Sequence, residues 1–418
     1  MNHFSISFLP NSKITGLPCG HSKTFLLSIK FCNNIAISFS LSLSPPLTAD
    51  LHAFLVKVSL MKEIGFFNNE FKSLKTESKK SFKFMSDSIY TKILPIIKNR
   101  DDKRLYLNMS SKYICDKDLH TLRDVHTLYI YGCDKITDLV PLAGVKRLGL
   151  VYCQNIKDVS VLGNVHTLSI EGCDNITDIS GLNNVYNLNL CRSQNIVDTH
   201  IVWNNHTLNI SHTTIGDAEL CKSDFSNVHT LYLDTCVYIT NKCIYRLANT
   251  HTLSISNTFI TNVEALGNVH TLNLGGLCSL ITDEGIDRLG SVYSLNLSHC
   301  SKITGKGIST LANVYDLDLS YCGNIKYLSN CLSILVNIHT LKIRHCNNLT
   351  DIHLSAFKNV HTLDISGCDL ITKKGIKWLI NVHTLDISGC NRLRYRDLHI
   401  LKNVVNLKHR LKRDIYDF

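Results

Sequence analysis

Proline, methionine and tryptophan are rare in this chain of 418 residues, and it has no long apolar run. It contains six Pro, four Met and two Trp, and most of the prolines precede residue 100. Its apolar stretches, such as 24–29 and 35–47, are short or diluted by serine. Because a membrane-spanning helix needs about 20 consecutive apolar residues, we predict no membrane span and no membrane partner.

Motifs of common catalytic sites are absent as well. The sequence has no phosphate loop ending in Gly-Lys-Ser/Thr, no His-Glu-x-x-His and no Gly-x-Ser-x-Gly nucleophile elbow. A cysteine nucleophile needs a thiol distinguished by its environment, whereas most of the cysteines here share one repeat position. We therefore predict a protein that is not an enzyme and that holds no cofactor and no metal.

The charge and the cysteine content restrict the partners and the compartment. The formal net charge is +10, but the basic residues are scattered and accompany no aromatic platform, so no nucleic-acid partner is predicted. Seventeen cysteines would form a disulfide framework in a small secreted protein. This chain is large, and its first ten residues carry no Lys or Arg, so a signal peptide is not predicted. An intracellular compartment, cytoplasmic or nuclear, is expected.

A four-residue segment, Val-His-Thr-Leu or a close variant, recurs along most of the chain. Its copies are spaced by 19 to 24 residues, which is the period of leucine-rich repeats. The copies begin at Val125, Val145, Val165, Val185, Asn205, Val228, Thr250, Val269, Val292, Val314, Ile338, Val360, Val382 and Val404.

Each copy continues as Leu-x-Leu or Leu-x-Ile, as at Leu128 and Ile130. Period-two alternation places such a pair on one face of a short strand, toward a core that neighbouring repeats share. The longer copies continue with helical spacing, and the 20-residue copies leave room only for turns or single 3₁₀ turns. The predicted fold class is α/β: a leucine-rich-repeat solenoid with a curved parallel sheet and short convex helices or turns, spanning 123–410 with about 14 repeats and followed by a tail, 411–418.

A cysteine stands five residues after the first strand leucine in most copies. We interpret these cysteines as buried small residues with a weak hydrogen-bond donor. Zinc binding is the alternative, but it needs ligands that converge on one point, and one sulfur per repeat makes a line. The column consists of Cys133, Cys153, Cys173, Cys236, Cys300, Cys322, Cys346, Cys368 and Cys390, with Ser193, Thr213 and Thr258 in three further copies.

The stretch from Leu277 to Cys322 resembles the cysteine-containing subclass of leucine-rich repeats, and the resemblance covers about two thirds of the chain. Before the repeats, residues 1–82 lack sustained periodicity and are predicted to be irregular or poorly ordered. Residues 83–122 are similar to an F-box. In this segment Ile93, Leu94 and Ile97 share one helix face, Asp101-Asp102 makes a polar turn, and a second helix carries Leu105 and Met109.

The F-box resemblance implies that Ile93, Leu94, Ile97, Leu105 and Met109 bind a Skp-type adaptor. The segment departs from the family pattern, since Pro95 falls inside the first helix and the usual leading Leu-Pro is missing. A competing interpretation assigns Leu105 and Leu107 to an N-terminal repeat, because they lie one repeat period before Leu128 and Ile130.

Outward-facing strand positions are mostly threonine and other small polar residues, but larger residues interrupt them in two places. Aromatic and arginine side chains favour protein recognition, so these residues are the predicted cargo contacts. They are Tyr129, Tyr131, Tyr152, Arg192, His212 and Asp234 near the start of the arc, and His299, Tyr321, Lys342, Arg344 and His345 toward its end.

Histidine follows the first residue of most copies, as at His126, His166 and His229. Imidazoles stacked about 5 Å apart are able to bind a transition metal or to respond to pH. The alternative, which we favour, is a partly exposed ladder of neutral rings bonded to the adjacent backbone.

The resemblance to F-box/leucine-rich-repeat proteins implies a substrate receptor of a Skp/cullin/F-box ubiquitin ligase. The repeat arc would hold an unknown protein cargo, and the chemistry would belong to other subunits. The alternative function is a leucine-rich-repeat interaction scaffold without a ubiquitin link. The near-identical repeats, poor in Pro and rich in Asn, Ile and Lys, also resemble proteins encoded by giant viruses of amoebae, in which case the compartment is that of a host cell.

Overall fold

The computed structural model describes residues 6–9, 23–31, 35–43, 81–82, 106–110, 114–196, 203–277, 279–323 and 337–411. The chain divides into two units, Met1–Ser78 and Lys79–Phe418. The first unit holds a three-stranded antiparallel sheet of β1 (Ile6–Leu9), β2 (Lys23–Phe31) and β3 (Ile35–Leu43). Strands therefore lie where the sequence predicted an irregular segment. In β3 apolar residues alternate with alanine and serine, which is the period of a strand.

The second unit is built on one 16-stranded sheet in which strands consecutive in the chain are neighbours. All of its strand pairs are parallel, as the repeat pattern predicts. The strands are β4 (Ser81–Phe82), β5 (Tyr106–Ser110), β6 (Thr127–Tyr131), β7 (Arg147–Val151), β8 (Thr167–Glu171), β9 (Asn187–Asn189), β10 (Thr207–Asn209), β11 (Thr230–Tyr232), β12 (Thr252–Ser254), β13 (Thr271–Asn273), β14 (Ser294–Asn296), β15 (Asp316–Asp318), β16 (Thr340–Lys342), β17 (Thr362–Asp364), β18 (Thr384–Asp386) and β19 (Asn406–Lys408).

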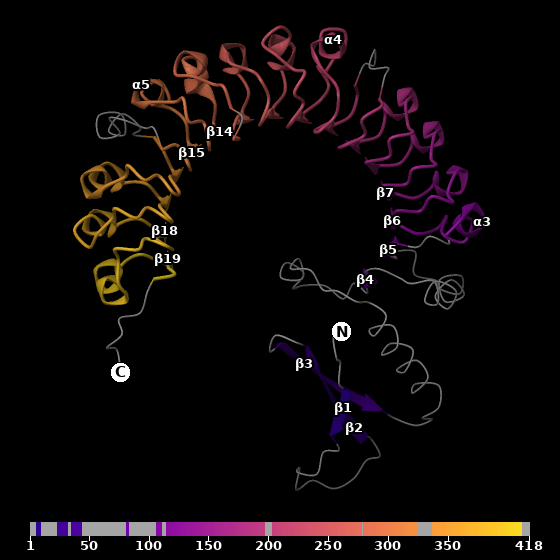
Figure 1. The fold of residues 1–418 in the computed structure, drawn as a ribbon, viewed down its shortest axis with the longest axis horizontal. Coiled ribbons are helices and arrows are strands. Elements are labelled where there is room, and N and C mark those ends of the chain that lie inside the picture. The colour runs from indigo at the N-terminus through magenta and orange to yellow at the C-terminus, as the bar shows by residue number, and fades with distance from the viewer. Residues whose placement is uncertain are drawn as a thin grey trace. The chain divides into compact units, whose positions relative to one another are not determined.

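Short helices follow the strands on the outer side of this sheet, and the strands β5–β19 line the inner side of a curve (Figure 1). The helices are α3 (Asp116–Leu119), η2 (Val140–Leu142), η3 (Ser160–Leu162), η4 (Ser180–Leu182), α4 (Asp217–Leu220), η5 (Ile244–Leu247), η6 (Glu264–Leu266), η7 (Glu284–Ile286), η8 (Leu289–Ser291), α5 (Gly305–Ile308), η9 (Asp351–Phe357), η10 (Ile376–Leu379) and η11 (Tyr395–Leu401). The 20-residue repeats carry single 3₁₀ turns, as predicted. Across the described ranges, no helix has the length and hydropathy of a membrane span.

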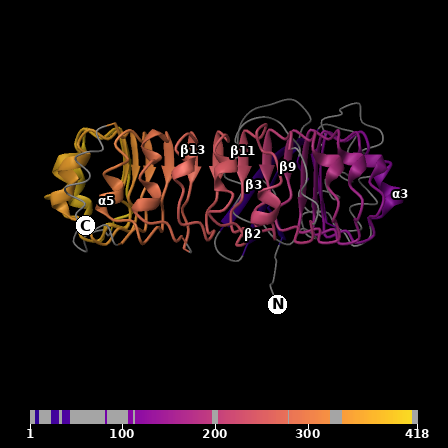
Figure 2. The same cartoon turned by 90° about the horizontal axis from the view of Figure 1, so that it is seen from above.

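The core of the solenoid is a set of aliphatic columns that run from repeat to repeat. Leu128 pairs in register with Leu148, and Leu148 with Leu168, and all three are buried. Seen from above, the repeats succeed one another as parallel coils of similar width (Figure 2). Each coil therefore buries its inward strand face against its two neighbours, which is the arrangement that the Leu-x-Leu pairs predict.

The cysteine column is buried and hydrogen-bonded to the backbone. The Sγ of Cys322 donates to the carbonyl of Leu297 at 3.1 Å, and the Sγ of Cys368 donates to that of Ile343 at 3.0 Å. The hydroxyl of Ser193 makes the equivalent bond to Ile170 at 3.0 Å. Burial raises the pKa of Cys300 to about 11. These thiols are protonated donors that join successive repeats, as the sequence pattern predicts.

The start of the solenoid differs from the predicted F-box helices. Residues 106–110 form strand β5, which pairs with β6 so that Leu107 aligns with Leu128 and Met109 with Ile130. The predicted second helix is therefore wrong at 106–110, and adaptor binding by Met109 stays a prediction. The alternative of an N-terminal repeat agrees with this strand, because Leu107 and Leu128 occupy matching positions of β5 and β6. Ile93, Leu94, Ile97 and Leu105 lie outside the described residues.

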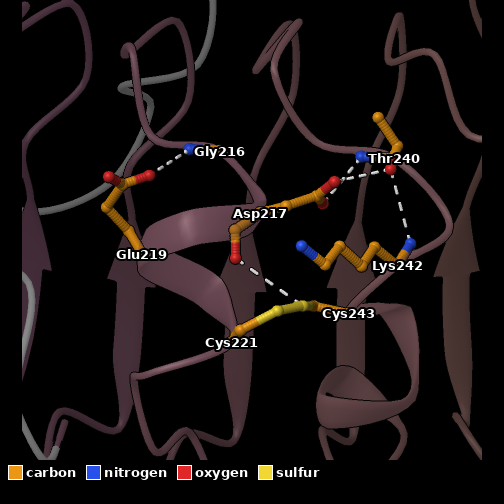
Figure 3. The surroundings of a disulfide bond; sticks show 7 residues. All are labelled: Gly216, Asp217, Glu219, Cys221, Thr240, Lys242 and Cys243. Carbon is orange, nitrogen blue, oxygen red and sulfur yellow. Dashed lines mark hydrogen bonds between the residues drawn. A yellow bond between two sulfur atoms is a disulfide. The ribbon is translucent and has the colours of Figure 1, made fainter.

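A disulfide joins two cysteines that do not belong to the cysteine column. Cys221 directly follows α4, Cys243 directly precedes η5 in the next repeat, and their Cα atoms are 5.4 Å apart (Figure 3). Beside the disulfide, the carboxylate of Asp217 accepts bonds from the backbone N–H and the hydroxyl of Thr240, at 2.9 and 2.5 Å. The disulfide links neighbouring repeats on the convex side. The repeat pattern does not predict this disulfide, because neither cysteine lies at a repeated position.

Candidate protein-binding surface on the concave face

One backbone position of the repeat, just after the strand and before the cysteine column, lies in the left-handed region. Some repeats place glycine there, at Gly132, Gly172, Gly276, Gly367 and Gly389. Other repeats place a side chain there at φ between 50° and 64°, at Tyr152, Arg192, His212, Thr235, Asn257, His299, Tyr321 and His345. We call this set of positions the left-handed column.

Residues other than glycine are unfavourable at the positions of the left-handed column. For an L-residue the left-handed conformation costs about 1–2 kcal/mol. Glycine at the same position in other repeats shows that the fold does not need a side chain there. Strained residues of this kind cluster at functional sites. Six of the predicted cargo contacts belong to the column: Tyr152, Arg192, His212, His299, Tyr321 and His345.

The N-terminal patch, defined as Tyr129, Tyr131, Tyr152, Glu171 and Arg192, is a connected cluster. The rings of Tyr131 and Tyr152 meet edge to face with centroids 6.1 Å apart. Arg192 Nη1 lies 2.8 Å from Glu171 Oε1 and donates to the Tyr152 hydroxyl at 3.5 Å. Burial and the nearby Glu171 carboxylate raise the pKa of Tyr131. The tyrosines remain 37–42% exposed, so the patch presents rings and a guanidinium to a partner.

Glycines in adjacent repeats make room for these rings. A Cβ at position 149 would meet the ring of Tyr129, and one at position 172 would meet the ring of Tyr152. The rings of Tyr129 and Tyr152 therefore lie against the backbone of the next repeat, which limits their freedom before a partner arrives.

The other two predicted contacts of this region have different surroundings. His212 is exposed and follows Arg192 in the left-handed column. Asp234 is half-buried, and its Oδ1 accepts bonds from the Ser254 hydroxyl, the Ser256 hydroxyl and the Ser256 backbone N–H, at 2.5, 2.6 and 2.8 Å. The carboxylate of Asp234 is thus occupied within the protein, and its main role is to connect neighbouring repeats.

The C-terminal patch combines ion pairs with stacked rings. Lys342 Nζ lies 3.8 Å from Asp318 Oδ2, and Arg344 Nε lies 2.6 Å from Asp364 Oδ2. In the left-handed column His299 stacks on Tyr321 at 4.3 Å, and Tyr321 stacks on His345 at 4.8 Å. We define the patch as His299, Asp318, Tyr321, Lys342, Arg344, His345 and Asp364. An open hollow beside it is lined by strand residues of β13–β16.

Sequence reasoning missed the acidic members of both patches. Glu171, Asp318 and Asp364 stand one repeat away from the cations that they pair with. Only Asp318 and Lys342 occupy matching strand positions, so a comparison of neighbouring repeats reveals that pair but not the other two. Asp318 and Asp364 also accept the backbone N–H of the residue two positions later, Ser320 at 2.9 Å and Ser366 at 3.0 Å. Such turns end the strands, so these carboxylates have both a structural and a surface role.

Comparisons with known proteins identify the repeats. The Leucine Rich repeat family matches residues 292–312 and 358–378. No curated protein matches the sequence.

Several solved structures resemble the chain in fold. TLR13 in complex with ssRNA13 has a TM-score of 0.57 and 18% identity, over 80% of this chain and 52% of that one. An internalin of Listeria monocytogenes has a TM-score of 0.38 and 18% identity, over 79% of this chain and 91% of that one. The yeast complex of Rad7 and Elc1 has a TM-score of 0.44 and 15% identity, over 79% of this chain and 86% of that one. The chain therefore contains leucine-rich repeats arranged as a solenoid of this fold.

Proposed function

We propose that this leucine-rich-repeat chain is a non-catalytic binding protein that holds a protein partner on its concave face. One observation carries the proposal: bulky side chains occupy a left-handed backbone position at which other repeats have glycine. Core packing does not offset the free-energy cost of this left-handed backbone conformation, since Tyr152, Arg192 and His212 are exposed. Contacts with a partner explain why such residues stand there.

The chemistry of both patches favours a protein partner. Tyrosine and arginine are the residues most often found at the energetic centres of protein interfaces. In the described part of the chain the cations of the patches are paired, Arg192 with Glu171 and Arg344 with Asp364. Because these pairs largely neutralise the charge, polar and aromatic contacts suit the surface better than a polyanion does.

The test is to return the left-handed column to glycine at the N-terminal patch. The full chain with Tyr152→Gly, Arg192→Gly and His212→Gly is immobilised beside the unchanged chain, and the captured proteins are compared by mass spectrometry. We expect at least about a tenfold loss of specifically captured protein, because truncating one central residue often costs 2 kcal/mol or more. Thermal stability is expected to stay the same or rise, since glycine relieves the left-handed strain.

A matched control changes the same column outside both patches. Thr235→Gly and Asn257→Gly relieve the same backbone strain and should leave capture unchanged. If the patch variant captures every protein as well as the unchanged chain does, the concave assignment is wrong.

A second candidate function is substrate recognition for a Skp/cullin/F-box ubiquitin ligase. It is supported by the helix-like spacing of Ile93, Leu94 and Ile97 ahead of the repeats. It is weakened by strand β5, which removes the second helix of the F-box pattern from 106–110. An origin in a giant virus of amoebae stays a prediction.

Pull-down with a purified Skp-type adaptor separates the two candidates. Adaptor bound by the full chain, and lost on Ile93→Asp with Leu94→Asp, would support the ligase receptor. If the full chain does not bind the adaptor, the first candidate remains: a binding protein without a ubiquitin link. The concave glycine variant is the control here, because it should keep any adaptor binding.

A further inference from the structure

A continuous stack of aromatic rings runs along the solenoid, at the position just before each strand. Neighbouring ring centroids are 4.3–5.0 Å apart and most ring planes are within 18° of parallel. The rings in order are His166, Tyr186, His206, His229, His251, His270, Tyr293, Tyr315, His339, His361 and His383. Two runs within it consist only of histidine, which we call run A (His206, His229, His251, His270) and run B (His339, His361, His383).

The rings are held in place at two points. Nδ1 of His251 lies 3.3 Å from the hydroxyl of Thr252, and Nδ1 of His361 lies 3.3 Å from that of Thr362. The backbone N–H of His251 donates to the carbonyl of His229 in the previous repeat at 3.1 Å. These contacts orient each ring toward the stack, so the distance between neighbouring rings follows the spacing of the repeats.

We propose that runs A and B form an acid-sensitive element, in which protonation places like charges at stacking distance and weakens the contact between adjacent repeats. This element lies outside both concave patches and acts on the solenoid itself. Two unit charges about 4 Å apart repel even in water strongly enough to change a protonation equilibrium roughly fivefold. Histidine is the side chain that changes charge near neutral pH. His229 and His251 in run A and His361 in run B have a histidine on both sides.

Within the described part of the chain, no negative charge near His251 or His361 compensates for protonation of these rings. Desolvation lowers the pKa of His251, and the neighbouring His229 and His270 lower it further. The pKa of His361 is lowered by desolvation and then by His339 and His383. Among the described residues, these histidines are the charged groups that act on the two rings.

Tyr186 and Tyr293 flank run A, and Tyr315 flanks run B on one side. Asp316 follows Tyr315 and aligns in register with Thr340, so a carboxylate lies near His339, the end ring of run B. Neither His251 nor His361 has an Asp or Glu of the described ranges acting on it. The threonine hydroxyls beside the rings do not titrate in this range.

The direction of the pH effect follows from these shifts. Because the folded-state pKa values of His251 and His361 lie below the ordinary value of 6.5, the unfolded chain takes up protons first as the pH falls. The contribution of the uncharged rings to the stability of the fold is therefore fully present above pH 6.5 and is lost progressively below it.

A variant made from the ladder's own residues tests the proposal. His229→Tyr, His251→Tyr and His361→Tyr leave no two adjacent histidines in the stack, and tyrosine already occupies this position in other repeats. Thermal unfolding of the full chain is followed by circular dichroism from pH 8 to pH 5. We expect the melting temperature of the unchanged chain to fall by at least about 2–4 °C more than that of the variant, and the two to depend on pH similarly above 7.

The control replaces the same number of histidines outside the stack, His120, His399 and His409, with tyrosine. It should keep the pH dependence of the unchanged chain. An equal loss of stability on acidification in the ladder variant and the unchanged chain would overturn the proposal.

If the ladder variant does not fold, ring titrations of the unchanged chain by NMR decide. His251 and His361 should then take up their protons below pH 6.5, the ordinary value for histidine. Titration of both at or above that value would overturn the proposal.

Discussion

Replacing Cys221 and Cys243 with serine is expected to lower the free energy of unfolding of the oxidised protein by about 3 kcal/mol. The disulfide closes a loop with a sequence separation of 22, and a crosslink of that length removes about this much chain entropy from the unfolded state. The covalent bond also joins α4 to the start of η5, so neighbouring repeats separate less readily (Figure 3). Urea unfolding with and without a reductant measures the effect.

Two controls isolate the disulfide. Cys191→Ser removes a half-buried free thiol and should change stability little in either condition. The unchanged chain in reductant should match the double serine variant to within about 1 kcal/mol. Identical unfolding curves of the unchanged chain with and without reductant would show that the crosslink does not stabilise the solenoid.

Arg344→Ala is expected to destabilise the fold by about 2 kcal/mol as well as to alter the C-terminal patch. The side chain of Asp364 is only 11% exposed, and Arg344 Nε is 2.6 Å from its Oδ2. Removing one partner leaves a nearly buried carboxylate uncompensated, which costs 3–5 kcal/mol in a fully buried pair. The cost is smaller here because Arg344 itself is 46% exposed and water can reach the site.

A double variant shows whether the lost partner or the lost side chain matters. Adding Asp364→Asn to Arg344→Ala should recover most of the stability, because the amide oxygen can still accept the Ser366 N–H and carries no charge. Lys342→Ala serves as the control, since its pair with Asp318 is longer and more exposed and is worth about 1 kcal/mol or less. Equal losses for Lys342→Ala and Arg344→Ala would contradict the argument.

The repeat architecture was predictable from the sequence because each repeat uses the same residues for the same contacts. Leu128 and Ile130 lie where period-two alternation places them, and the cysteine column is buried against the backbone as its small size indicates. The 3₁₀ turns of the 20-residue repeats followed from chain length alone. The predicted F-box helix failed at 106–110 because isolated short segments have weak local preferences, and pairing with β6 decided the conformation.

The concave site was predictable only in part. Outward strand positions identified the large side chains, but not which of them touch. Ion pairs such as Arg192 with Glu171 join residues one repeat apart, and their geometry depends on how one coil lies on the next. The glycines of the left-handed column were visible in the sequence, yet the backbone conformation that they share with Tyr152 or His345 emerges only from φ.

By itself the sequence determined the repeat, its period and its buried columns, because these depend on the order of apolar and polar residues along one coil. The tertiary structure decided where the array begins, which charges pair, that Cys221 meets Cys243, and how closely the histidine rings stack. Those features depend on distances between coils. Such distances arise only when many repeats bury their faces together and set a common spacing.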